Sequence, residues 1–233
     1  NKVICVSRRQ YEIITKYIPE LKRKTTITYN PPPQLPLIEK KLEENQVYSI
    51  LVRGAMLRAF NIVLKSLLKI LKRYECKAYV IYEREVKTSQ KLLLEGVSSK
   101  LGSKLILLGK LPHRKYLKLH ESVWRLLFPS ISEEPLPYAI VEPMLIGTIP
   151  IASRTGGIPE IIEGTPAESY LFKPEDINEL IDKLDLLLFQ PRGYIENIRA
   201  ELREHALKMF NPKGVEFKIV KILQSVLTSY NTK

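Results

Sequence analysis

The stretch FPSISEEPLPYAIVEPMLIGTIPIASRTGGIPE, residues 128–160, decides the predicted fold. Proline fits the first turn of a helix and glycine its end, so a helix is predicted over 137–147. The apolar run Ile149–Ala152 predicts a short buried strand. The pair Gly156–Gly157 then lets the backbone come close to whatever lies above the strand end, and Ile158–Glu160 opens the next helix.

Two helix N-termini are therefore expected beside one strand end. Each offers unpaired N–H groups and a partial positive charge, which suit a phosphate. Glu134 and Glu142 flank the leading turns of the first helix, and ionised carboxylates accept hydrogen bonds from sugar hydroxyls. The layout predicts a ligand with a charged middle and hydroxylated ends, such as a nucleotide-diphosphate sugar. The alternative is a surface helix with ordinary glutamates beside a glycine turn.

The same residues carry a resemblance to a known family. The segment resembles the donor-binding segment of the retaining, GT-B-fold glycosyltransferases of group 1, the large family that includes glycogen and sucrose synthases and bacterial mannosyltransferases. The family pattern is P-S, a Glu, seven residues, a second Glu, then A-M-A-x-G-x-P-V-I-A-x-x-x-G-G-x-x-E. The matching positions here are Pro129, Ser130, Glu134, Glu142, Met144, Gly147, Pro150, Ile151, Ala152, Gly156, Gly157 and Glu160.

Two arginines lie further upstream. Arg53 follows an apolar strand and Arg58 lies near the start of a long amphipathic helix, where two guanidinium groups can clamp a phosphate; the alternative is two surface arginines. The family pattern at this place is G-R, about four residues, then K-G-F, and its Arg and Lys hold the donor's diphosphate. Arg53 and Phe60 stand on the family's Arg and Phe, Arg58 replaces the Lys, and Val52 and Ala59 replace the glycines.

Strand-like and helical segments alternate along the chain. Strands are predicted over 3–7, 25–29, 47–52, 78–82, 105–108, 124–128, 149–152 and 169–172, and helices over 8–17, 57–74, 91–100, 137–147, 174–189, 192–210 and 212–230. Residues 39–46 are expected to form a short helix or a mobile segment. This order predicts an α/β fold: a Rossmann-like, doubly wound parallel sheet with C-terminal helices. Ligands of such sheets bind beyond the carboxyl ends of the strands, where Arg53, Leu111, Glu134 and Gly156 all fall.

The resemblance implies a role for each of these residues. Arg53 and Arg58 would stabilise the departing diphosphate without a metal, Glu134 would hold hydroxyls of the transferred sugar, and Glu142 would hold the ribose hydroxyls. The turn at Leu111–Pro112 would lie against the base. Backbone amides near Tyr138 and Ala139 and at Gly156–Gly157 would assist.

Two departures from the family pattern bear on these roles. The family has F-G-L or C-G-L after the first Glu, whereas this chain has Leu136-Pro137-Tyr138. Because proline has no N–H, one amide contact is lost or is replaced by Tyr138, which implies an altered donor or a weakened enzyme. The family's G-x-G turn is also replaced by Glu83-Arg84-Glu85.

The composition excludes several classes of protein. The chain is 45% hydrophobic but has no apolar run near twenty residues, so no membrane span is expected. Cys5 and Cys76 are expected to be buried thiols of a cytosolic protein without a disulfide. No His, Cys or Asp cluster has metal-ligand spacing.

The three histidines are weighed singly. His113 is interpreted as a solvent-facing residue at a helix start, the alternative being a phosphate contact or proton transfer. His120 and His205 are given neither partner nor role.

The resemblance covers only half of a GT-B enzyme. Residues 1–233 are expected to form one nucleotide-sugar-binding domain, whose helical tail, from about 190, would pack toward an N-terminal acceptor domain that is missing here. The implied reaction is metal-independent hexosyl transfer with retention from a UDP-, GDP- or ADP-hexose, without a cofactor. The chain alone would bind the donor and turn over poorly. A cytoplasmic location is expected, with peripheral membrane contact through a lipid-linked acceptor as an option.

Two other classes of function stay open. A regulatory or scaffold relative would bind the donor without transfer. A basic Rossmann-like nucleic-acid-binding module would use the net charge of +12. Nucleic acid is the weaker interpretation, because the sequence has no ladder of base-stacking aromatic residues.

Overall fold

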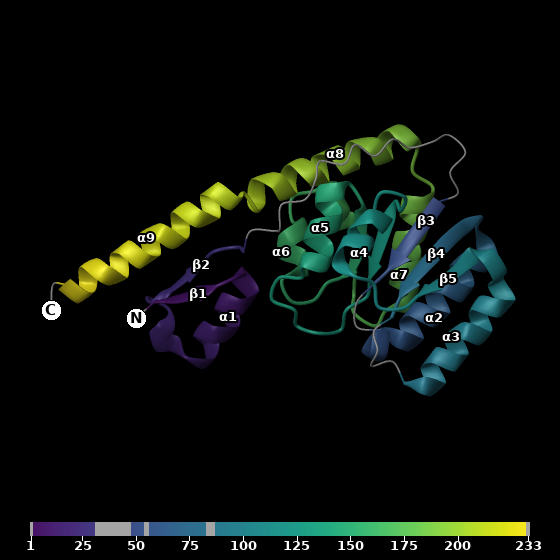
Figure 1. Ribbon diagram of the computed structural model, residues 1–233, viewed down its shortest axis with the longest axis horizontal. Coiled ribbons are helices and arrows are strands. Elements are labelled where there is room, and N and C mark those ends of the chain that lie inside the picture. Colours follow the sequence, from purple (N-terminus) through teal and green to yellow (C-terminus); the bar gives the residue numbers. More distant parts are fainter. Residues whose placement is uncertain (1, 31–47, 54–55, 83–86, 232–233) are drawn as a thin grey trace.

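A six-stranded sheet forms the centre of the protein (Figure 1). The computed structural model describes residues 2–30, 48–53, 56–82 and 87–231, without the side chains of 56–58 and 229–231. Every strand pair of this sheet is parallel. The strand order is β5 (Leu105–Leu108), β4 (Cys76–Ile81), β3 (Tyr48–Val52), β6 (Arg125–Phe128), β7 (Ile149–Ser153) and β8 (Leu171–Phe172).

Helices cover both faces of this sheet, as predicted for a doubly wound fold. The helices of this part of the chain are α2 (Met56–Arg73), α3 (Thr88–Leu101), α4 (His113–Leu119), α5 (Tyr138–Ile146), α6 (Ile158–Ile162), α7 (Ile177–Leu188) and α8 (Arg192–Met209), with 3₁₀ turns η2 (Gly102–Lys104) and η3 (Pro166–Tyr170). Helix α9 (Pro212–Asn231) follows α8, and the 3₁₀ turn η1 (Pro19–Leu21) lies between α1 (Arg8–Tyr17) and β2 (Thr25–Ile27). Helix α2 packs against α3 and α7, and α5 packs against α8. None of the helices within the described ranges is long and apolar enough to cross a membrane.

A second, smaller sheet lies apart from the first. Strands β1 (Val3–Cys5) and β2 (Thr25–Ile27) pair in parallel and are joined by α1 (Arg8–Tyr17). We call residues 3–27 the N-terminal unit. Helix α9 runs alongside this unit, at the end of the molecule away from β5 (Figure 1). The expectation that residues 1–233 form one domain stays a prediction, and the structure adds that their strands divide into two sheets.

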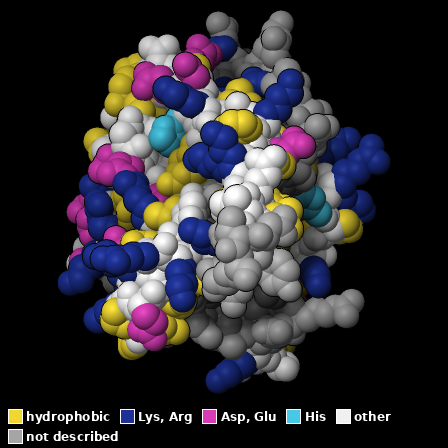
Figure 2. All heavy atoms as spheres, turned by 90° about the vertical axis from the view of Figure 1, so that its left-hand side faces the viewer, with side chains coloured by type: hydrophobic (Ala, Val, Ile, Leu, Met, Phe, Trp, Pro, Cys, Tyr) yellow, Lys and Arg dark blue, Asp and Glu magenta, His cyan; other side chains and the backbone are white. Residues whose placement is uncertain are grey.

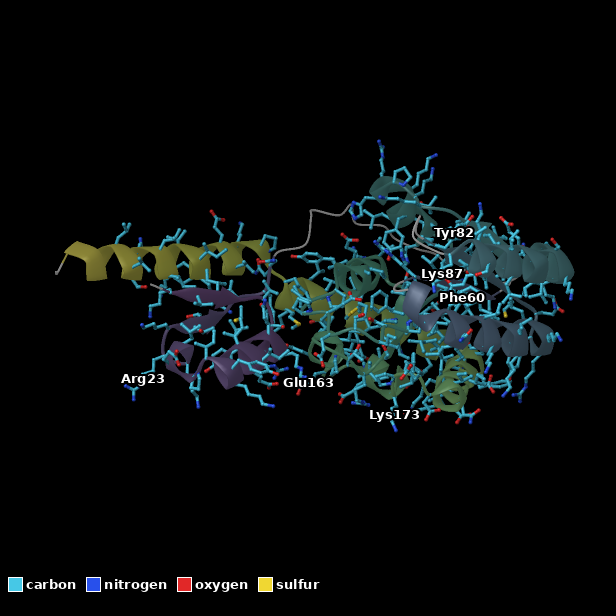
Figure 3. All side chains as sticks on the ribbon, turned by 90° about the horizontal axis from the view of Figure 1, so that it is seen from below. Arg23, Phe60, Tyr82, Lys87, Glu163 and Lys173 are labelled. Carbon is cyan, nitrogen blue, oxygen red and sulfur yellow. The ribbon has the colours of Figure 1, made fainter. Side chains whose placement is uncertain are left out.

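The carboxylate of Glu160, at the start of α6, fastens the N-terminal unit to the larger sheet. It accepts the backbone N–H of Arg8 at 2.9 and 2.8 Å and the hydroxyl of Tyr29 at 2.6 Å. The guanidinium of Arg8 adds ion pairs to Glu160 and Glu163. Figure 3 shows Glu163 where the N-terminal unit meets the rest of the molecule, with Arg23 at the far end of the unit. Burial raises the pKa of the Tyr29 hydroxyl, and its hydrogen bond to Glu160 acts in the same direction.

We expect Glu160→Ala to loosen the N-terminal unit and to lower the free energy of unfolding by about 2–3 kcal/mol, because hydrogen bonds to a buried charged acceptor are lost. Limited proteolysis should cleave the variant faster within residues 2–30. Glu163→Ala is the matched control, since its side chain is 59% exposed and exposed ion pairs contribute little. Equal proteolysis of the two variants would contradict this role of Glu160.

Most predicted elements are confirmed to within a few residues, and three differ. Helix α7 begins at Ile177, not Pro174, because the Asp176 side chain accepts the N–H of Glu179 at 3.0 Å and caps the helix there. Helix α3 begins earlier than predicted, at Thr88. The strand predicted over 169–172 keeps only β8, because its first half belongs to η3. Both cysteines are buried and free, as predicted, and the short helix or mobile segment expected over 39–46 lies outside the described residues.

Candidate functional site

The residues singled out by the sequence gather at one edge of the large sheet. Because all six strands are parallel, their carboxyl ends lie at the same edge. Arg53 follows β3, Leu111–Pro112 lies between β5 and α4, and the Glu134 loop follows β6. Gly156–Gly157 follows β7. The structure therefore brings the four separate segments to a common edge.

Arg53 is the basic group at the centre of this edge. Its backbone N–H donates to the carbonyl of Leu127 at 3.1 Å, which fixes the residue between β3 and β6. Its guanidinium carbon lies 3.8 Å from the ring centroid of Tyr116, a cation–π contact. The Nη1 atom of Arg53 is buried and has no hydrogen-bond partner within the described ranges. Arg58 belongs to the first turn of α2, but its side chain lies outside the described residues.

The Tyr116 ring of α4 holds the guanidinium of Arg53 through this cation–π contact. Its side chain is buried, and its hydroxyl donates to the carbonyl of Ala139 in α5 at 3.3 Å. Burial raises the pKa of Tyr116 to about 12, although the positive charge of Arg53 opposes the shift. The ring therefore stays neutral at physiological pH, and it holds the guanidinium of Arg53 while joining α4 to α5.

Two histidines have partners that the sequence did not reveal. His120 is fully buried, its ring meets Tyr116 edge-on at 4.6 Å, and its Nδ1 lies 3.1 Å from the hydroxyl of Thr148. The Nε2 atom of His205 lies 3.0 Å from the carbonyl oxygen of Ile161. The prediction that these two histidines have no partners is wrong, because both partners are distant in sequence.

Glu142 is the buried carboxylate of the site. It lies in the second turn of α5, and its side chain is 7% exposed. Its Oε1 accepts a hydrogen bond from Nε2 of His113 at 2.9 Å. His113, the first residue of α4, is 52% exposed, so it faces solvent on one side and Glu142 on the other. The interpretation of His113 as a solvent-facing residue at a helix start is confirmed, and the structure adds its contact with Glu142.

Glu134 is held by its own loop. Its Oε1 accepts the hydroxyl of Ser130 at 3.0 Å, and its carbonyl accepts the N–H of Gly157 at 2.9 Å. The glycine pair is needed at this contact. A Cβ on Gly156, whose φ is +55°, would come within 2.3 Å of the Glu134 carbonyl oxygen, and one on Gly157 within 2.0 Å of the Pro135 carbonyl oxygen. The close approach predicted for the pair is thus made, in this structure, to the backbone of the Glu134 loop.

We expect Gly157→Ala to lower the free energy of unfolding by about 1–3 kcal/mol, because the added methyl group forces the Glu134 loop and the β7–α6 turn apart. Gly96→Ala is the matched control. Position 96 lies within α3 with open space around its Cβ position, so alanine there should stabilise the helix by about 0.5–1 kcal/mol. Urea unfolding of both variants measures the difference, and a neutral Gly157→Ala would contradict the close contact.

The remaining predicted site residues belong to the turn between β5 and α4 and to the start of α5. Leu111 packs against the core, and Pro112 caps α4, where its carbonyl accepts the N–H of Tyr116 at 3.0 Å. Tyr138 is the first residue of α5, after the cap Pro137, and burial raises its pKa. Within the described ranges, no three His, Cys, Asp or Glu side chains group so that they could hold a metal ion.

A comparison with protein-family models places the chain. The model described as "Glycosyl transferases group 1" matches residues 42–209. The chain belongs to this family. The match covers the six-stranded sheet and its helices through α8, so the N-terminal unit and α9 lie outside it.

Solved structures share this fold at low sequence identity. A glycosyltransferase from Rickettsia africae has a TM-score of 0.80 and 16% identity, over 97% of this chain and 64% of its own. Sucrose-phosphate synthase from Thermosynechococcus elongatus has a TM-score of 0.78 and 18% identity, over 97% and 58%. HepE from Anabaena, in complex with UDP and glucose, has a TM-score of 0.76 and 18% identity, over 96% and 63%.

The shares of each chain that are covered show that the chain matches only part of each solved structure. The chain spans about 58–64% of the length of these solved structures. The family match and the fold fit the C-terminal domain of a group 1 glycosyltransferase. No curated protein matches the sequence.

Proposed function

We propose that the chain is the donor-binding half of a glycosyltransferase and binds a nucleoside-diphosphate hexose at the carboxyl edge of the large sheet. One observation carries the proposal: a guanidinium group whose buried Nη1 has no partner among the described residues and a buried carboxylate reach this edge around a single helix, α4. Tyr116 contacts Arg53, and His113 contacts Glu142. The neighbour HepE, solved with UDP-glucose, supports a ligand of this class.

In this proposal each site residue binds a different part of the nucleotide sugar. Arg53, together with Arg58, neutralises the diphosphate as it leaves, an electrostatic role that needs no metal. Glu142 accepts hydrogen bonds from the ribose hydroxyls and Glu134 from the hexose hydroxyls. The Leu111–Pro112 turn supports the base, and the first amides of α5, at Tyr138 and Ala139, face the phosphates. The family resemblance supports transfer with retention.

Catalytic turnover is proposed for a longer assembly. Helix α9 exposes the apolar side chains of Phe217, Leu223 and Leu227, each more than half exposed, and β1 exposes Ile4. A further acceptor-binding domain that packs on this surface would complete a GT-B enzyme, and the shorter coverage of the solved structures agrees with it. The chain alone is then expected to bind the donor and to transfer hexose poorly.

Thermal unfolding in the presence of UDP, GDP, ADP and their common hexose conjugates tests the proposal. Ligands that bind the native state raise Tm by mass action. We expect stabilisation by one nucleotide series. Stabilisation by none of them, with a salt-dependent shift on adding single-stranded DNA or RNA, would favour the nucleic-acid alternative.

The surface charge bears on that alternative. Figure 2 views the molecule from the end where α9 and the N-terminal unit lie, and Lys and Arg side chains there are interspersed with hydrophobic and acidic ones. A polyanion is held best by a continuous basic face. The described part of this face therefore gives the nucleic-acid alternative no support.

A further inference from the structure

Two hydrogen bonds join helices α4 and α5. His113 and Tyr116 lie three residues apart on α4, and their partners Ala139 and Glu142 lie three residues apart on α5. Residues at this spacing share one face of a helix. Both contacts are partly buried. The Tyr116 side chain is buried, whereas the His113 side chain is 52% exposed.

The geometry restricts the Glu142 carboxylate. A carboxylate oxygen only accepts, so Nε2 of His113 is the donor of the 2.9 Å hydrogen bond to Oε1. The described residues supply no other hydrogen bond to this carboxylate, so Oε2 remains available for a ligand. His113 itself is held in place, because Pro112 caps α4 and the helix is anchored one turn later by Tyr116.

From this geometry we infer that His113 is a positioning residue that fixes the Glu142 carboxylate for the ribose, and so sets the preference for ribonucleotide over deoxyribonucleotide donors. The inference rests on the proposed function. The hydrogen bond from the imidazole to Oε1 restrains the rotation of the carboxylate, and Oε2 meets the vicinal 2′- and 3′-hydroxyl groups of a ribose, which donate to it. A ligand without these hydroxyls gives Oε2 no hydrogen-bond donors within a largely buried side chain, and such a loss discriminates strongly.

The test compares UDP with 2′,3′-dideoxy-UDP by calorimetry, or the guanosine or adenosine pair if thermal unfolding selects that base. The ratio of the two Kd values measures hydroxyl recognition alone, because base and diphosphate are common to both. For His113→Ala we expect this ratio to fall roughly tenfold, with little change in the Kd of the dideoxy compound. His113→Gln keeps an N–H donor at similar reach and should retain the wild-type ratio.

Two controls separate positioning from other roles. Arg114→Ala removes the exposed neighbouring side chain and should leave the ratio unchanged. Adding His113→Ala to a Glu142→Ala variant should cause no further fall in the ratio, because the histidine acts only through that carboxylate.

Each outcome decides the inference. An unchanged ratio in His113→Ala would overturn it, and so would equal weakening of both ligands, which would place His113 against phosphate or base. A wild-type protein that binds UDP without preference for the hydroxyls would contradict the ribose role of Glu142. Failure to bind any of the three nucleoside diphosphates would instead reject the proposed function, and the inference with it.

Discussion

Replacement of Arg53 by alanine is expected to weaken binding of the nucleoside diphosphate by roughly 100-fold or more. The guanidinium is held by the Tyr116 ring at 3.8 Å, and its buried Nη1 has no hydrogen bond in the free protein as far as the structure describes it. A diphosphate oxygen would supply that partner, and charge-assisted hydrogen bonds are the strong ones. Calorimetry with UDP, GDP and ADP measures the loss.

The controls for this variant are matched in charge. Arg23→Ala removes an exposed arginine at the far end of the N-terminal unit (Figure 3) and should leave the affinity unchanged. Arg53→Lys should recover only part of it, because an ammonium group cannot stack on the tyrosine ring and bind two phosphate oxygens as a guanidinium does. An unchanged affinity in Arg53→Ala would contradict the placement of the diphosphate at this edge.

Replacement of Glu142 by alanine is expected to weaken the nucleoside diphosphate about 10- to 100-fold, since hydrogen bonds from two hydroxyls to a buried charged acceptor are lost. The free energy of unfolding should change little, because its partner His113 is half exposed and can bond to water instead. Glu95→Ala, on the exposed surface of α3, is the control. An unchanged Kd would contradict the ribose assignment.

The sequence predicted the sheet edge because its signals there are local. Pro137 and Gly147 bound α5 as expected, and Gly147 takes the left-handed conformation, with φ of +80°, that ends many helices. The alternation of apolar strands and helices likewise predicted the doubly wound sheet. Residue spacing along the chain was therefore enough to predict an element wherever its ends depend on local backbone signals.

The contacts between elements were beyond reach of the same reasoning. The hydrogen bond between His113 and Glu142 joins two helices that the periodicity of each helix cannot relate, and the contact of Glu160 with Arg8 joins α6 to α1 of the N-terminal unit. The Asp176 cap was locally readable, but Pro174 gave a competing signal for the start of α7. Partner identity therefore needed the three-dimensional arrangement, whereas element type did not.

The central claim is the place of the ligand, and a crystal structure with the nucleotide sugar selected by thermal unfolding tests it most directly. We predict the diphosphate at Arg53, the ribose at Glu142 beside His113, and the hexose at Glu134. The face between α2 and α7 offers a rival, a cavity of about 820 Å³ lined in part by Lys65, Lys69 and Lys173. Density for the ligand in that cavity, with the carboxyl edge of the sheet empty, would contradict the account.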